Sequence, residues 1–151
     1  MTYSISITSE EGEVIEIGNE TKEVSLITDL IIHMDTTTNN VSEKAMGMLA
    51  KITVKGKIID DETVKNKYIA LFNWSKSLSK SQWYRDIVIK SYIDEDHDDV
   101  YRTYQFDKVF IVDYKEIYSA SNNKDSNSSG TDHFELYLTQ KENNFKAIET
   151  Y

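Results

Sequence analysis

The chain has 151 residues, a formal net charge of −9 at pH 7, 39% hydrophobic residues and neither cysteine nor proline. We expect one domain over residues 1–151, because a chain of this length and apolar content can bury one core. Without cysteine, disulfides, thiolate metal sites and cysteine nucleophiles are excluded, and the excess of acids argues against nucleic-acid binding through phosphates. The sequence shows no signal-peptide pattern and no apolar run near the roughly 20 residues that span a bilayer, so we expect no membrane insertion and a product that is cytoplasmic as synthesised.

Strands are predicted for most of the first sixty residues. Residues 2–8 alternate Ile or Tyr with Ser or Thr, the period of a strand with one buried face, and 14–17 form the returning strand. Residues 24–34, rich in Val, Leu and Ile, are predicted to be a third extended segment. We expect a long loop over 35–48 and then a strand over 50–59, where lysines alternate with apolar residues.

One helix is predicted from Glu62 to Leu78. Asp60 or Asp61 can accept hydrogen bonds from its first amides, and an acid also suits the positive end of the helix dipole. Apolar positions at spacings of three and four form one stripe: Val64, Tyr68, Leu71, Phe72, Ser75 and Leu78. The lysines lie mostly off this stripe, which indicates a helix that packs on a sheet and shows its other face to water.

The rest of the chain is predicted to be β-structure. The expected strands are 86–93, 100–106, 108–118, 133–138 and a short closing strand at 145–148. The segment 108–118, KVFIVDYKEIY, is apolar on both faces, as in a strand that is covered on each side. A polar loop rich in Ser, Asn and Gly is expected at 120–132. The predicted fold class is therefore mainly β with one flanking α-helix.

The densest run of candidate ligands is DEDHDD, from Asp94 to Asp99. A calcium loop of the EF-hand type needs a glycine at its sixth position and a glutamate at its twelfth, where this chain has Asp99 and Gln105. A single histidine is also a poor basis for a transition-metal site. We therefore predict the tip of a hairpin at 94–99, and keep a cation-dependent protein as a third alternative.

No other residue pattern predicts catalysis. His33 and His133 are expected to be sheet residues, and no serine has the glycine pattern of a nucleophile elbow. The five glycines are scattered, so a phosphate-binding loop is also missing. Trp74 and Trp83 are predicted to pack in the core or at its rim, with a ligand platform as the alternative, and Asp113 is expected to be structural. We predict no catalytic residue, no cofactor and no metal ligand.

The residues predicted to contact another subunit are Met46, Met48 and Leu49. Methionine adapts to irregular surfaces and recurs at protein contacts. The alternative for the same residues is a loop end that tucks under the sheet.

The C-terminal half resembles a known family. A strand and an acidic hairpin are followed by YRTYQFDKVFIVDYKEIYS, a polar loop and GTDHFELYLTQKENNFKAI. This order, over about residues 50–148, resembles the tube-forming proteins of contractile injection machines: phage tail tubes, the Hcp tube protein of type VI secretion and related small Firmicutes proteins. The most suggestive pieces are Tyr104–Tyr118 and Phe134–Lys141.

The resemblance implies a curved β-sandwich or β-barrel with one flanking α-helix, whose copies form rings, usually of six, that stack into a hollow tube. The predicted helix fits the family's single helix, and residues 35–49 fit the extended loop that contacts the neighbouring ring. Spike, sheath or baseplate proteins would be further partners, and export as part of an injection apparatus or phage-like particle is left open. The alternative function is a monomeric β-sandwich module that binds carbohydrate or peptide through Trp74, Trp83 or surface tyrosines.

Overall fold

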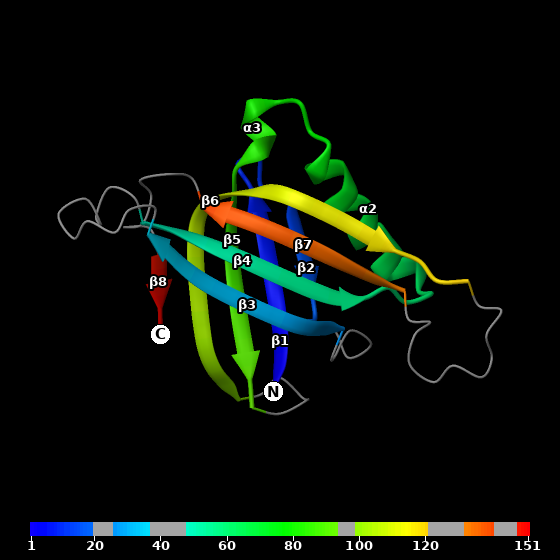
Figure 1. The fold of residues 1–151 in the computed structure, drawn as a ribbon, viewed down its shortest axis with the longest axis horizontal. Coiled ribbons are helices and arrows are strands. Elements are labelled where there is room, and N and C mark those ends of the chain that lie inside the picture. The colour runs from blue at the N-terminus through cyan, green and yellow to red at the C-terminus, as the bar shows by residue number, and fades with distance from the viewer. Residues whose placement is uncertain (20–25, 37–47, 94–98, 121–131, 141–147) are drawn as a thin grey trace.

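The molecule consists mainly of antiparallel strands with one long helix, which confirms the predicted fold class (Figure 1). The computed structural model describes residues 1–19, 26–36, 48–93, 99–120, 132–140 and 148–151. The elements are β1 (Thr2–Ser9), β2 (Val14–Ile17), β3 (Ile27–Thr36), β4 (Met48–Lys57), α2 (Glu62–Ser75), α3 (Lys80–Trp83), β5 (Arg85–Tyr92), β6 (Val100–Ile117), β7 (His133–Gln140) and β8 (Ile148–Thr150). The sheet order is β2-β1-β5-β6-β7-β4-β3, and β8 pairs with β6 beside this path.

Alternating sequence places the core between two groups of strands. In β1 and β5, Ile5 pairs with Ile89 and Ile7 with Ile87, and all four side chains are buried. In β7 every second residue is buried, as the period of two predicts. Figure 1 shows β1 and β5 crossing the direction of β3, β4 and β7, so the apolar faces of the two groups meet in one core.

Strand β6 belongs to both groups, where the sequence predicted two separate strands. It is continuous over Val100–Ile117 and bends near Lys108, whose φ of 57° lies in the left-handed region. Lys108 donates its backbone N–H to Asp86 Oδ1 at 3.3 Å, and its Nζ lies 3.0 Å from Glu10 Oε1. These contacts hold an otherwise uncommon conformation for a residue with a side chain. The first half of β6 pairs with β5, and the second half pairs with β7.

A second irregularity corrects the predicted faces of 108–118. The β6–β7 register shifts between Ile111 and Asp113, which reverses the side on which later residues point. Val112 is 61% exposed and Asp113 is exposed, whereas Tyr114 packs against the core. The expected strand with two covered faces is therefore wrong.

Helix α2 begins where the sequence predicted and ends at Ser75, earlier than Leu78. The Asp61 carboxylate accepts hydrogen bonds from the N–H groups of Thr63 and Val64, so Asp61 is the capping residue. The buried face consists of Val64, Tyr68, Leu71 and Trp74. Phe72 is 51% exposed, Leu78 is 93% exposed and Ser75 is also exposed, so the predicted stripe was wrong at these three positions.

Strand ends account for the remaining differences. Residues 35 and 36 belong to β3 and residue 48 belongs to β4. The predicted loop over 35–48 therefore began two residues too early and ended one residue too late. Strand β4 ends at Lys57, before the predicted end at 59, and β8 is Ile148–Thr150, whereas residues 145–147 of the predicted closing strand lie outside the described residues. The short helix α3 was not predicted.

Candidate functional site

The two histidines expected to be sheet residues do lie on strands, and they are far apart on one face of the sheet. His33 on β3 is exposed and stands opposite Lys51, whereas His133 on β7 stands opposite Lys57, at the other end of β4. His133 Nε2 lies 3.8 Å from Glu135 Oε1. The fold therefore does not bring these two histidines together.

The acidic stretch occupies the connection between β5 and β6. Tyr92 pairs with Val100, and Ile93 donates its backbone N–H to the carbonyl oxygen of Asp99 at 3.0 Å, which is the hairpin that the sequence predicted. Residues 94–98 lie outside the described residues. Within the described ranges, no group of three or more His, Asp and Glu side chains could hold a metal ion. No helix in the described part of the chain is long and apolar enough to cross a membrane.

Two of the three predicted subunit-contact residues lie at the end of the β3–β4 ladder. Met46 is outside the described residues, whereas Met48 pairs through its backbone with Thr36 at the last position of the ladder. Leu49 pairs with Asp35 and is half-buried. The β3–β4 ladder thus ends at Thr36 and Met48, and residues 37–47 between them lie outside the described residues.

Trp74 and Trp83 line a partly open hollow of about 370 Å³ beside α3. Trp74 is 3% exposed and donates its indole N–H to the carbonyl oxygen of Trp83, and Trp83 donates its own to the carbonyl oxygen of Ser77. Phe110 and Tyr84 complete the aromatic wall, with ring centroids 5.9 Å apart. Trp74 is thus a core residue, and Trp83 is the more accessible of the two indoles.

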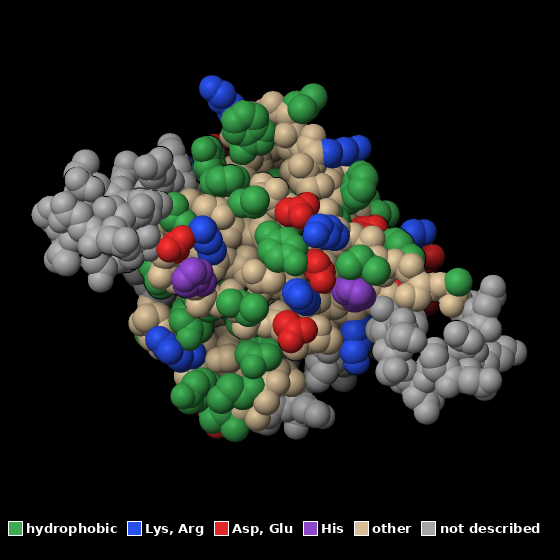
Figure 2. All heavy atoms as spheres, in the orientation of Figure 1, with side chains coloured by type: hydrophobic (Ala, Val, Ile, Leu, Met, Phe, Trp, Pro, Cys, Tyr) green, Lys and Arg blue, Asp and Glu red, His purple; other side chains and the backbone are tan. Residues whose placement is uncertain are grey.

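The outer face of β4, β7 and the second half of β6 is a charged network. Figure 2 shows acidic and basic side chains interspersed over these strands, with hydrophobic side chains gathered at the lower end of the same face. Tyr137 Oη donates to Glu135 Oε2 at 2.9 Å, and this hydrogen bond lowers the pKa of Glu135 and raises that of Tyr137. Lys55 lies 3.6 Å from the same carboxylate. Mutual neutralisation leaves this face without one dominant sign of charge.

Two grooves are lined by residues from several elements. We name the first the helix groove, about 290 Å³ between α2 and the end of β6, and its lining includes Asp60, Glu62, Ile69, Phe72, Glu116 and Tyr118. The second, the seam groove, has about 300 Å³, and its lining includes Tyr3, Leu30, Ile32, Tyr101, Arg102 and Tyr104. Strands β1 and β3 both contribute to the lining of the seam groove, although they are not neighbours in the sheet order.

The side chains of the helix groove are arranged around Glu116. Tyr114 and Tyr118 donate hydrogen bonds to its two carboxylate oxygens at 2.8 and 2.9 Å. The hydrogen bond to Glu116 raises the pKa of Tyr118, and burial raises that of Tyr114. Both phenols therefore stay neutral donors at physiological pH, and Glu116 is held in place as an acceptor.

The seam groove is built around Arg102. Its guanidinium carbon lies 4.8 Å from the centroid of the Tyr104 ring, and its Nε donates to Thr150 Oγ1 at 3.3 Å. The Tyr104 ring in turn stacks on Phe106, which is fully buried. Sequence reasoning missed Arg102, Ile69 and Phe72 as surface residues of interest, since no local pattern distinguishes them.

Solved structures with the same fold come from contractile injection systems and Hcp proteins. Hcp1 from the E. coli EAEC 042 pathovar has a TM-score of 0.59 over 100% of this chain and 98% of its own, at 11% identity. A chain of the anti-feeding prophage baseplate, 6-fold symmetrised, has a TM-score of 0.51 over 99% and 91%, at 8% identity. A chain of the PVC sheath–tube complex, an extracellular contractile injection system, has 0.51 over 99% and 87%, at 14% identity.

The chain has the Hcp tube-protein fold. This confirms the resemblance seen in the sequence and extends it from residues 50–148 to the whole chain, N-terminal strands included. At these identities the likeness shows the fold alone. No protein-family model and no curated protein sequence matches the chain.

Proposed function

We propose that the chain is a structural, non-enzymatic subunit of the inner tube of a contractile injection apparatus, and that its copies associate into rings that stack. The observation that carries this proposal is the likeness, over the whole length of the chain, to Hcp1 and to chains of two injection assemblies. A ring of six is the expected stoichiometry, and spike, sheath or baseplate proteins are the expected further partners. Export would occur as part of such an apparatus.

Open strand edges supply a physical reason for self-association. Strands β2 and β3 end the described sheet, and β5 pairs with β6 only as far as Val109, although β6 continues to Ile117. Such edges expose unpaired backbone N–H and C=O groups, which favour contact with another chain. In a closed ring every copy uses these margins in the same way, so an aggregation hazard becomes a defined assembly.

Contact between stacked rings is assigned to residues 35–49, with Met46, Met48 and Leu49 as its apolar side chains. Residues 35 and 36 of β3 and residues 48 and 49 of β4 lie at one end of the β3–β4 ladder (Figure 1). Replacing all three by Ser should leave single rings intact and abolish longer stacks. Rings that still stack to wild-type length would contradict this assignment.

Size-exclusion chromatography with light scattering, over a wide range of protein concentrations, tests the proposal. The expected species has the mass of a ring, and electron microscopy should show rings and, at the highest concentrations, short tubes. A chain that remains monomeric at every concentration would refute the assignment as a tube subunit.

A second candidate function rests on the aromatic hollow beside α3. Its volume of about 370 Å³ falls in the range of small-ligand pockets, and Trp83 exposes part of its indole there. A monomeric module of this kind would bind carbohydrate or peptide. Titration with oligosaccharide and peptide libraries, followed by tryptophan fluorescence, should show saturable binding that Trp83→Ala removes if this function is correct.

A further inference from the structure

The helix groove and the seam groove carry opposite charge. The charged side chains that line the helix groove are four acids and one lysine: Asp60, Asp61, Glu62, Lys65 and Glu116. Lys65 pairs with Glu62 at 3.8 Å, so it compensates one acid only. Among the described residues that line the seam groove, the one charged side chain is Arg102. The two surfaces are therefore electrostatically complementary.

We propose that the seam groove of one copy docks on the helix groove of the next copy, with Tyr101 and Arg102 as its anchors, so that the chain associates head to tail. This inference rests on the proposed function and names the two surfaces that would join neighbouring subunits within a ring. The occupant of each groove is a second copy of the same chain.

Exposed apolar side chains accompany the charges on both sides. Ile69, Phe72 and Tyr118 are exposed beside the helix groove, and Tyr101 is 56% exposed beside the seam groove. Apolar patches with a polar rim are typical of protein-contact surfaces, and Tyr and Arg are enriched among residues that dominate binding. In the docked pair, Phe72 would be buried against the seam groove and Tyr101 against the helix groove, and together they would supply the apolar centre of the contact.

Arg102 is already oriented for such a contact. Stacking on Tyr104 and the hydrogen bond from its Nε to Thr150 restrict its side chain. Within the described residues that is the guanidinium's one hydrogen bond, so its terminal nitrogens can donate to a carboxylate in the planar, paired geometry that arginine favours. A side chain that is ordered before binding loses less entropy on association.

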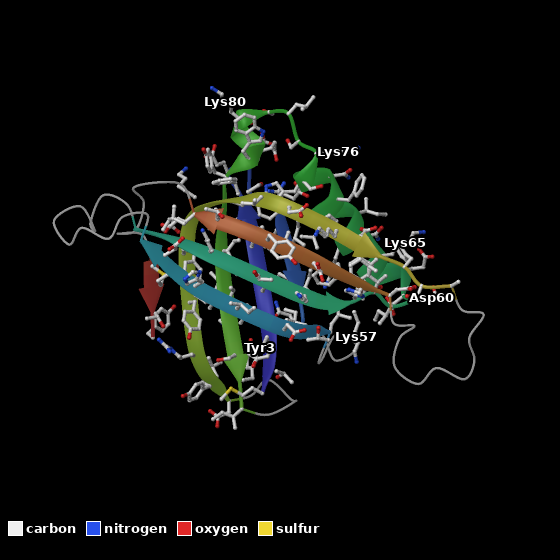
Figure 3. The ribbon with its side chains drawn as sticks, viewed as in Figure 1. Tyr3, Lys57, Asp60, Lys65, Lys76 and Lys80 are labelled. Atoms are coloured by element: carbon white, nitrogen blue, oxygen red, sulfur yellow. The ribbon has the colours of Figure 1, made fainter. Side chains whose placement is uncertain are left out.

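The two grooves lie on different sides of the molecule. Figure 3 places Asp60 and Lys65 at the right beside α2, and Tyr3, which lines the seam groove, near the lower end of the strands. A contact between two different surfaces of one chain is heterologous, and a pair of copies joined in this way keeps one free surface of each kind. Such a contact repeats from copy to copy until it closes into a ring.

Two variants block one surface each. Ile69→Gln/Phe72→Gln removes the exposed apolar side chains of the helix groove and keeps good helix formers on α2. Arg102→Glu places an acid opposite the acids of the helix groove. Leu78→Gln and Lys90→Glu are the matched controls, because both residues are exposed and line neither groove.

Each blocking variant alone should be monomeric at concentrations where the wild type and both controls assemble, with apparent dissociation constants raised by about tenfold or more. An equimolar mixture of the two blocking variants should form a dimer of one copy of each, because one intact surface of each kind remains. Native mass spectrometry with one variant isotopically labelled identifies that dimer. Circular dichroism checks that both variants are folded.

The outcomes separate this contact from the function on which it rests. If the wild type assembles and a folded blocking variant assembles equally well, the contact is wrong and the proposed function stands. A mixture of folded variants that stays monomeric also overturns the contact. If the wild type itself never assembles, the proposed function and the contact fall together.

Discussion

Replacing Gly56 by alanine tests the packing that joins β4, β7 and α2. Gly56 pairs with Phe134 across the β4–β7 ladder. A methyl group at residue 56 would lie 2.6 Å from the Phe134 ring and 2.8 Å from the carbonyl oxygen of Leu26. Both distances are shorter than any normal carbon contact, so a neighbour must move.

Moving either the Phe134 ring or the Leu26 carbonyl group would cost packing or hydrogen-bond energy. Phe134 is fully buried and lies against the Tyr68 ring, at 5.9 Å between centroids. The carbonyl oxygen of Leu26 accepts the backbone N–H of Lys57 at 2.9 Å. Overpacking of this kind costs about 1–3 kcal/mol, and we expect the upper part of that range here. Alanine also lowers the conformational entropy of the unfolded chain, which offsets about 0.4–1 kcal/mol of this cost. The free energy of unfolding should therefore fall by about 2 kcal/mol.

Urea and thermal unfolding, followed by tryptophan fluorescence at protein concentrations below assembly, measure the loss. For a chain of this size we expect the midpoint temperature to fall by about 4–8 °C. In a double-mutant cycle, Phe134→Leu should recover part of the loss in the Gly56→Ala background, because the smaller side chain frees the ring position. A Gly56→Ala protein as stable as the wild type would refute the described close packing.

Three further changes test local contacts, each by urea unfolding unless stated. Asp61→Ala should destabilise the protein by about 1 kcal/mol through loss of the α2 cap, and Asp61→Asn should restore most of it; equal losses would rule out capping as the cause. Tyr68→Phe removes the hydroxyl that donates to the carbonyl oxygen of Lys57 at 2.8 Å, and should cost about 0.5–1.5 kcal/mol. Tyr137→Phe should raise the pKa of Glu135 toward its ordinary value in a carboxyl NMR titration. Because the pKa of Glu135 is lowered in the folded protein, this hydrogen bond contributes stability above the ordinary carboxyl pKa, and the contribution is lost as the pH falls through the lowered value. A Glu135 pKa that is the same in Tyr137→Phe and in the wild type would contradict this assignment.

Local sequence patterns predicted the elements whose burial follows a simple period. Strand β7 alternates without interruption, and the start of α2 was predicted from Asp61 and the apolar spacing that follows it. In both cases the signal lies within a few consecutive residues. The first strand of the chain and its return were predicted for the same reason.

The irregular positions were not predictable in this way. The bend of β6 rests on Lys108 in a left-handed conformation, where sequence rules expect glycine, asparagine or aspartate. On α2, Leu71 and Phe72 both follow Tyr68 at helical spacing, and only the rotation of the helix against β2 and β6 decides that Leu71 is buried. These outcomes depend on tertiary packing.

The two grooves could not be predicted from local sequence patterns, because their lining residues come together only in the tertiary fold. The seam groove joins Tyr3, Ile32 and Arg102, which come from three strands far apart in the sequence. Their proximity follows from the sheet order, in which β1 and β3 approach each other without pairing. The acidic run at 94–99 is a conspicuous sequence pattern, whereas no pattern marks Arg102, which is the charged residue of the described seam groove.

Charge also decides which pairs of surfaces can meet. Two helix grooves facing each other would oppose one set of acids to another, and two seam grooves would oppose one Arg102 to another. Both symmetric pairings are therefore disfavoured, whereas the mixed pairing gains attraction, and this difference selects head-to-tail contact over a two-fold dimer. Because exposed charges are screened beyond about 8 Å at physiological ionic strength, the selection acts at close range and weakens with added salt. Assembly of the wild type should accordingly weaken as salt is added without being abolished, because the burial of Phe72 and Tyr101 in the head-to-tail contact does not depend on charge.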